Sequence, residues 1–114
     1  MLTIYHNPRC RKSRAGLEYL RSKQVAFQVV DYLNTGLNDT IIHEILLKSN
    51  LNITDLVRKQ EDLYRKELKG KSFHEDEWIR IICENPKLLE RPIIVSKYKA
   101  VVGDPVEVIE ELFR

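Results

Sequence analysis

Two short β-rich segments flank a helical one in the first 32 residues, and this opening restricts the fold more than any other feature. Residues 2–5 and 25–32 are rich in apolar and β-branched side chains, as strands usually are. Between them, Leu17 and Leu20 continue a helical spacing that extends to about Lys23. Two strands joined through a helix form a parallel pair with a right-handed crossover. The opening therefore predicts a small α/β domain.

The rest of the chain is predicted to contain several helices, then two strands and a last helix. The middle elements are expected to be a helix capped by Asn38 or Asp39 and helices over residues 54–60, 62–69 and 74–84. The apolar segments at residues 93–95 and 100–102 are adjacent and are expected to close as a hairpin. Asp104, Pro105 and Glu107 match the N-cap, the first helical position and the capping box of a last helix.

Composition narrows the class of protein. The chain has 114 residues, of which 43% are hydrophobic and 32% charged, as in an ordinary folded domain. Its net charge is only +2, which argues against binding to nucleic acid or to a membrane surface, and no apolar run is long enough to span a membrane. The first residues do not resemble a signal peptide, so we expect a cytoplasmic protein with reduced thiols.

The two cysteines give no sign of a disulfide framework or a metal site. Cys10 and Cys83 match no zinc-binding spacing, and His43 and His74 are isolated from other ligands, so no metal is expected. A glycine-rich phosphate loop is also missing, so no nucleotide cofactor is expected. Cys83 falls within a predicted helix beside apolar residues, and we interpret it as a packed core thiol.

Cys10 lies between the end of the first strand and the start of the first helix. Free amide groups and the helix dipole favour a thiolate there, and such settings lower a cysteine pKa from about 8.5 to roughly 3.5–7.5. The same amides would hold an oxyanion beside the sulfur. Positive charge is expected to add to both effects from four nearby side chains: Arg9, Arg11, Lys12 and Arg14.

Other interpretations of this loop remain open from the residues alone. Free cysteines are often buried as small apolar residues, although four cations nearby argue against a dry site for Cys10. His6 either bonds to backbone at the end of its strand or acts on the thiol as a charge or hydrogen-bond donor. Pro8 stiffens the turn in either case.

Three segments together resemble the arsenate reductase family of the ArsC type, which is coupled to glutathione and glutaredoxin. The first is the run His6-Asn7-Pro8-x-Cys10-x-x-Ser13-Arg14. The second is residues 56–59 with the downstream Tyr64, and the third is residues 85–95, with the sequence NPKLLERPIIV. The resemblance implies a thioredoxin-like fold in a single domain over residues 1–114. A helical insertion over approximately residues 38–88 would separate its β-α-β and β-β-α halves.

The resemblance also implies an enzyme and a set of site residues. Cys10 would attack arsenate, His6 would support the thiolate, and Pro92 would lie beside the cysteine after a cis peptide bond. The substrate would be bound by four residues: Ser13, Arg14, Arg58 and Arg91. Glutathione would act as co-substrate and glutaredoxin would resolve a mixed disulfide, with no cofactor bound.

The sequence departs from the family pattern at one position. A third family arginine, just before a proline near the last helix, corresponds here to Asp104. An acidic residue there replaces a positive charge with a negative one close to the expected anion, so like charges would oppose arsenate binding. Alternatively, Asp104 serves only as a helix cap. Arg58 and Arg91 also have simpler interpretations, as a solvated surface arginine and as the partner of a neighbouring carboxylate.

Two alternative functions follow from the same residues. The first is a regulator similar to the Spx proteins, which share this fold and bind RNA polymerase. Many of them switch through a Cys-x-x-Cys pair, and Ser13 excludes that disulfide here. The second is a monothiol glutathione-dependent reductase of another substrate, because one thiolate suffices to form a mixed disulfide with glutathione.

Overall fold

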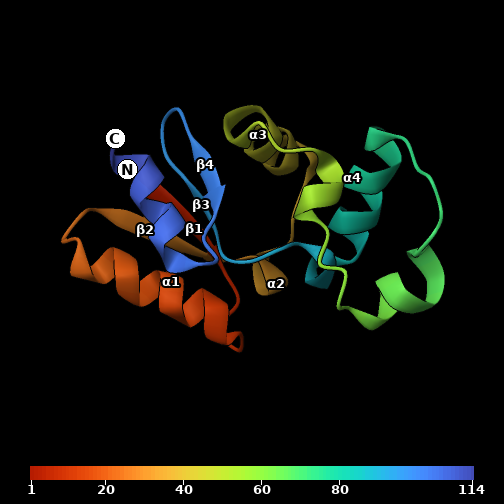
Figure 1. The fold of residues 1–114 in the computed structure, drawn as a ribbon, viewed down its shortest axis with the longest axis horizontal. Helices are drawn as coiled ribbons and strands as arrows, with labels where there is room; N and C mark the ends of the chain where they lie inside the picture. Colours follow the sequence, from red (N-terminus) through yellow and green to blue (C-terminus); the bar gives the residue numbers. More distant parts are fainter. The chain divides into compact units, whose positions relative to one another are not determined.

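Four strands form one mixed sheet in the computed structural model, which describes residues 1–114 (Figure 1). The strand order is β2-β1-β3-β4, and β1 (Leu2–His6) pairs parallel to β2 (Phe27–Asp31). The short strands β3 (Ile93–Val95) and β4 (Ala100–Val102) pair antiparallel to their neighbours. The predicted parallel pair and the predicted hairpin are therefore both confirmed.

The chain divides into two compact units. The sheet unit consists of Met1–Thr35 and Arg91–Arg114, and the insertion unit consists of Gly36–Glu90. The expected insertion, residues 38–88, falls within the insertion unit. The description of residues 1–114 as one domain stays a prediction.

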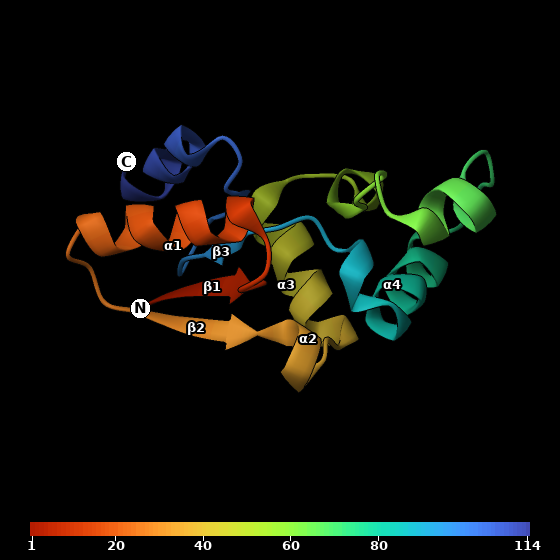
Figure 2. The same cartoon turned by 90° about the horizontal axis from the view of Figure 1, so that it is seen from below.

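One face of the sheet is covered by α1 (Arg11–Ser22) and by η4 (Val106–Phe113), a 3₁₀ helix near the C-terminus (Figure 2). Successive side chains of a strand point to opposite faces of the sheet. The paired residues Ile4 of β1 and Ile94 of β3 point to the face that these helices cover. Four fully buried side chains form its centre: Ile4 and Ile94 from paired strands, Leu20 from α1 and Ile109 from η4. This layer is the core of the sheet unit.

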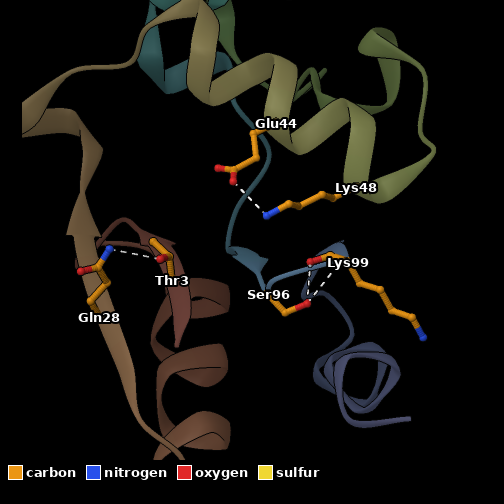
Figure 3. Close-up of polar contacts among 6 residues, drawn as sticks. All are labelled: Thr3, Gln28, Glu44, Lys48, Ser96 and Lys99. Carbon is orange, nitrogen blue, oxygen red and sulfur yellow. Dashed lines mark hydrogen bonds and ion pairs between the residues drawn. The ribbon is translucent and has the colours of Figure 1, made fainter.

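Polar contacts close the connections between strands (Figure 3). The Gln28 side chain donates to the Thr3 hydroxyl at 3.2 Å across the parallel pair. In the hairpin, the Ser96 N–H donates to the Lys99 carbonyl at 2.7 Å, and the Ser96 hydroxyl and the Lys99 N–H pair at 3.0 Å. These bonds fix where β3 turns into β4.

Strand directions bring several loops to one edge of the sheet. β1 and β2 end there, β3 begins there and β4 ends there, because Tyr5 pairs with Ile93 and Ile93 pairs with Val102. The loop from β1 into α1 leaves the same edge. The Gly103 N–H donates to the Pro92 carbonyl at 2.8 Å and joins the loops flanking β3 and β4. The edge therefore gathers the segments that contain Cys10, Arg91 and Asp104.

Helices make up most of the insertion unit, which in sequence follows α2 (Tyr32–Thr35) and precedes β3. They are α3 (Asp39–Ser49), the 3₁₀ turn η1 (Ile53–Leu56), the π-helix η2 (Tyr64–Leu68), α4 (Glu75–Glu84) and the 3₁₀ turn η3 (Pro86–Leu88). The Asn38 side chain accepts from the Ile41 N–H at 2.9 Å, as an N-cap does. Lys48 pairs with Glu44 one turn earlier on α3 (Figure 3).

Two predicted helices differ from the structure. The helix expected over residues 54–60 ends at Leu56, because Val57 is extended and bridges to Leu89. The last helix begins at Val106 as a 3₁₀ helix, and Pro105 occupies its N-cap position without a side-chain cap. Asp104 is therefore not the predicted N-cap, and its carboxylate binds Lys12 instead. No helix in the structure is long and apolar enough to cross a membrane.

Candidate active site

Cys10 occupies the N-cap position of α1, where its backbone is extended, with φ −96° and ψ 126°. A turn shapes the approach to it. The Cys10 N–H donates to the Asn7 carbonyl at 3.0 Å, and the Asn7 side chain accepts from the Arg9 N–H at 3.0 Å. Asn7 is buried, and an asparagine that bonds to its own loop is typical of such turns. The sulfur is thus held, half-buried, at the start of the helix.

Several donors stabilise the negative charge of the Cys10 thiolate. Burial of the sulfur raises its pKa, but hydrogen bonds from the Arg91 guanidinium and from the Ser13 and Lys12 backbone N–H groups outweigh that effect. The Arg91 charge adds to them, and the pKa of Cys10 lies below its ordinary value. A lowered pKa increases the thiolate fraction near neutral pH, and the thiolate is the nucleophilic form.

The loop cations act differently from the prediction. The Lys12 contribution to the lowered pKa comes from its backbone amide. Arg9 and Arg11 are exposed, and the Arg14 guanidinium donates to the Pro8 carbonyl at 3.2 Å. The main cation at the sulfur is Arg91, which follows the insertion unit in sequence. A residue so distant in sequence has no local signal that links it to Cys10.

Ser13 is fully buried and supports the loop. Its hydroxyl accepts from the Asn7 N–H at 3.3 Å, and its own N–H points to the Cys10 sulfur. Its backbone amide, rather than its hydroxyl, is therefore the group available at the thiol. Of the two residues expected to bind substrate from this helix, Arg14 alone has an exposed side chain.

The loop before β3 places Arg91 beside the thiol. The Arg91–Pro92 peptide bond is cis, as the resemblance predicted. The Pro92 ring packs against α1 at Gly16, where a Cβ atom would lie 2.7 Å from the ring Cγ. That distance is shorter than any ordinary carbon–carbon contact, so only glycine fits at this position. The absence of a side chain at Gly16 lets the helix that carries Cys10 approach the loop that carries Arg91.

His6 lies at the end of β1, buried and in register with Asp31 of β2. Its Nδ1 atom and the Asp31 Oδ1 atom are buried and have no hydrogen-bond partner. Burial lowers the pKa of His6, and the Asp31 carboxylate only partly opposes this effect. No hydrogen bond joins His6 to Cys10. The proposed support of the thiolate by His6 is therefore not a direct bond in this structure.

We expect the free energy of unfolding of the His6→Asn variant to decrease less than that of the wild type as the pH falls. The folded-state pKa of His6 lies below the unfolded value, so the unfolded chain takes up a proton first as the pH falls. The resulting stability is present above about pH 6.5 and is lost as the pH falls through the folded pKa. Urea unfolding at pH 7, 6 and 5 should give a smaller decrease for His6→Asn than for the wild type. His43→Asn, at an exposed histidine, is the control and should follow the wild type.

An ion pair lies beside the thiol loop. The Lys12 Nζ atom is 2.9 Å from the Asp104 carboxylate, and the side chains are 48% and 41% exposed. Exposed pairs of this kind contribute about 0–1 kcal/mol to stability, so their effect on the free energy of unfolding is small. The pair matters more for the site, because Lys12 also provides a backbone amide to the sulfur. The sequence showed the acid at residue 104 but not its partner.

Arg58 belongs to the insertion unit and has partners there. Its guanidinium pairs with Glu61 at 2.5 Å, and its N–H donates to the Leu88 carbonyl at 2.6 Å. The side chain is 24% exposed, so it is not the freely solvated surface arginine of the simpler interpretation. Its role in oxyanion binding stays a prediction.

Cys83 differs chemically from Cys10. Burial raises its pKa, and the charges of Asp39 and Glu84 raise it further. At neutral pH it is therefore a protonated, weakly nucleophilic thiol. Cys83 is half-buried on α4, so it is not the fully packed core thiol that was predicted. No group of three or more histidine, cysteine or acidic side chains is arranged to hold a metal ion.

Several known proteins resemble this chain in sequence, and solved structures resemble it in fold. The ArsC family model matches residues 5–112. An arsenate reductase of Neisseria meningitidis (strain Z2491) is 40% identical over 111 residues, which cover 96% of this chain and 95% of that protein. The uncharacterized protein YfgD of Escherichia coli K12 is also 40% identical, over 96% of this chain and 93% of its own. A solved structure of an arsenate reductase from Vibrio cholerae superposes with a TM-score of 0.91 at 36% identity, covering 96% of this chain and 95% of that one.

Proposed function

This chain belongs to the ArsC family, and we propose that it is an arsenate reductase-like thiol oxidoreductase in which Cys10 attacks an arsenate-type oxyanion. The observation that carries the proposal is the set of donors around one sulfur: the Arg91 guanidinium and the N–H groups of Ser13 and Lys12. These groups favour the thiolate in the free protein. The same groups suit an oxyanion bound beside the sulfur, because they are preorganised hydrogen-bond donors.

The proposed reaction reduces arsenic by two electrons. The Cys10 sulfur forms a bond to arsenic while one arsenate oxygen leaves as water after protonation. A second thiol, which we assign to glutathione, then attacks this adduct at the Cys10 sulfur. The sulfur–arsenic bond breaks, arsenic keeps the electron pair and leaves as arsenite, and the two sulfurs form a mixed disulfide. Glutaredoxin would return Cys10 to the thiol by exchange.

Guanidinium groups are assigned to the oxyanion. Arginine suits tetrahedral anions because its planar fork offers two parallel N–H donors. Arg91 is the first assigned residue because it already bonds the thiol. Arg58 and Arg14 follow from the family pattern, with the Ser13 amide in place of its hydroxyl. We place the reaction in the cytoplasm, where glutathione keeps thiols reduced.

The assignment is tested by an assay of arsenate reduction with glutathione, glutaredoxin and a recycling reductase. Steady turnover that requires both the glutathione and the glutaredoxin would support the reaction as written. Turnover with glutathione alone would remove glutaredoxin from it. A lack of turnover with arsenate, together with reduction of a glutathione mixed disulfide, would favour the monothiol reductase instead. That second candidate is supported by the Asp104 carboxylate, which lies beside the thiol loop and opposes binding of an anion.

The Asp104→Arg variant is expected to bind arsenate more tightly than the wild type. The change removes a negative charge from the thiol loop and adds a positive one, while it releases Lys12 from its ion pair. Two charge effects of about 1 kcal/mol each at partly solvated distances predict a decrease in KM of about tenfold or more. Glu107→Arg makes the same charge reversal on the same segment without an ion pair to Lys12 and is the matched control. Equal decreases in KM for both variants would show a general charge effect and contradict a specific role for Asp104.

A further inference from the structure

A cavity of about 310 Å³ lies within the insertion unit, and the proposed reductase chemistry does not use it. Its walls come from the segment around η1, from η2 and from the segment that leads into α4. Its lining includes two lysines, a serine and three aromatic residues: Lys59, Lys71, Ser72, Tyr64, Phe73 and Trp78. Its volume lies at the lower end of the range for small-molecule sites, about 300–1,000 Å³.

The cavity is positively charged. Lys59 and Lys71 line it, and no acidic side chain does. Four acidic residues near it in sequence are bound elsewhere: Glu61 to Arg58, Asp62 to Arg65, Asp55 to the Asn52 N–H and Glu77 to the His74 N–H. Three others, Glu67, Glu75 and Asp76, are exposed and do not line the cavity. Neither Lys59 nor Lys71 forms an ion pair in the structure, so no carboxylate neutralises their charges. An anion is therefore the ligand that they favour.

Aromatic rings form the apolar part of the cavity. Phe73 and Trp78 pack edge to face, with centroids 5.0 Å apart and planes at 75°. Trp78 is only 5% exposed, so its ring is fixed in the wall, while Tyr64 is half-buried. Because the two planes are at 75°, a flat ligand can stack on one ring and meet the other at its edge. The Ser72 hydroxyl adds a group that can donate or accept a hydrogen bond.

The backbone around the cavity is unusual at the same place. Tyr64 begins η2, a single π-helical turn that runs to Leu68 and ends before Gly70, whose φ is +81°. Single π-helical turns are rare and occur frequently at functional sites. The turn places Tyr64 in the wall while the chain reverses toward Lys71 and Phe73. This local structure is a second observation that marks the cavity, independent of its charge.

We propose that the insertion unit binds a small aromatic anion in this cavity, with one flat ring in the corner between Phe73 and Trp78 and one phosphate or carboxylate group between Lys59 and Lys71. Phosphate and carboxylate share the chemistry that the two lysines select. The ring distinguishes the ligand from the inorganic oxyanion proposed for Cys10. No bond is made or broken at this site.

Trp78 allows a direct test, because it is the only tryptophan of the chain. Phenyl phosphate and phenylacetate are titrated into the full chain while tryptophan fluorescence is recorded. Inorganic phosphate, which lacks the ring, and benzyl alcohol, which lacks the charge, serve as partial ligands. We expect a saturable change with at least one aromatic anion and binding at least tenfold weaker for both partial ligands. The stronger of the two aromatic anions identifies the anionic group.

Two double variants distinguish binding in this cavity from a general effect of the protein's positive charge. The double variant Lys59→Met/Lys71→Met should weaken aromatic-anion binding by about tenfold. The double variant Lys66→Met/Lys69→Met removes two exposed lysines outside the cavity, and its affinity for the aromatic anion should stay within about twofold of the wild type. Equal weakening by both pairs, or no saturable change in the wild type, would overturn the proposal. The titration is repeated in Cys10→Ser, where binding should be unchanged. Failure of this proposal and failure of the reductase assignment are therefore distinguishable.

Discussion

Cys10→Ser is expected to lower the rate of arsenate reduction by about four orders of magnitude or more, to the level of the reaction without protein. A serine hydroxyl is not ionised near neutral pH, so the donors that stabilise the thiolate have no anion to act on. Serine also cannot form the disulfide that carries the two electrons. The measurement is single-turnover arsenite formation with glutathione and glutaredoxin in excess.

Cys83→Ser is the matched control for this prediction. It removes the other thiol, which is protonated at neutral pH because its pKa is raised, and its rate is expected to stay within about twofold of the wild type. Circular dichroism of both variants establishes that they are folded. If Cys10→Ser retained turnover while Cys83→Ser lost it, the nucleophile would be the wrong cysteine and the proposed site would fail.

Arg91→Ala is expected to decrease kcat/KM for arsenate by about 10²–10³-fold, since removal of one such preorganised donor has effects of that size. Two losses combine in this variant. The guanidinium no longer bonds the sulfur, so the pKa of Cys10 rises and the thiolate fraction at pH 7 falls. The oxyanion also loses the donor that we assign to it.

The pH dependence of alkylation separates the two losses. In a Cys83→Ser background, the rate of Cys10 alkylation by iodoacetamide should reach half its maximum at a higher pH in Arg91→Ala than with Arg91 intact. Arg91→Lys keeps the charge without the fork and should lie between them. Arg80→Ala removes an exposed arginine of α4 and should change neither the profile nor the turnover. An unchanged profile in Arg91→Ala would contradict its assignment to the thiol.

Local signals predicted the sheet unit well. Residues 2–5 lie in β1, the strand predicted over 25–32 is the shorter β2 because Tyr32 begins α2, and the hairpin at residues 93–95 and 100–102 formed as expected. The position of Cys10 at the start of α1 also followed from sequence, because a strand end and a helix start lie only a few residues apart there. These patterns depend only on residues close together in the sequence, so they can be recognised without a structure.

Long-range contacts caused the differences. Val57 was predicted to be helical, but its pairing with Leu89 made it extended. Asp104 was predicted to be an N-cap, but its carboxylate forms an ion pair with Lys12. The largest cationic effect on Cys10 came from Arg91 and not from the cations of its own loop. In each case the partner lies far away in the sequence, and only folding brings it close.

The discontinuity of the sheet unit has a consequence for synthesis. Met1–Thr35 leaves the ribosome before Gly36–Glu90, and Arg91–Arg114 follows only after the whole of Gly36–Glu90 has been made. Until then β1 lacks its partner β3, and Ile4 and Leu20 lack Ile94 and Ile109. The core that holds α1 on the sheet therefore forms late, because it joins segments separated by the whole insertion unit, and contacts so distant in sequence slow folding. A nascent chain carries Cys10 without Arg91, so its thiol lacks the guanidinium that lowers the pKa of Cys10 until Arg91–Arg114 has been made.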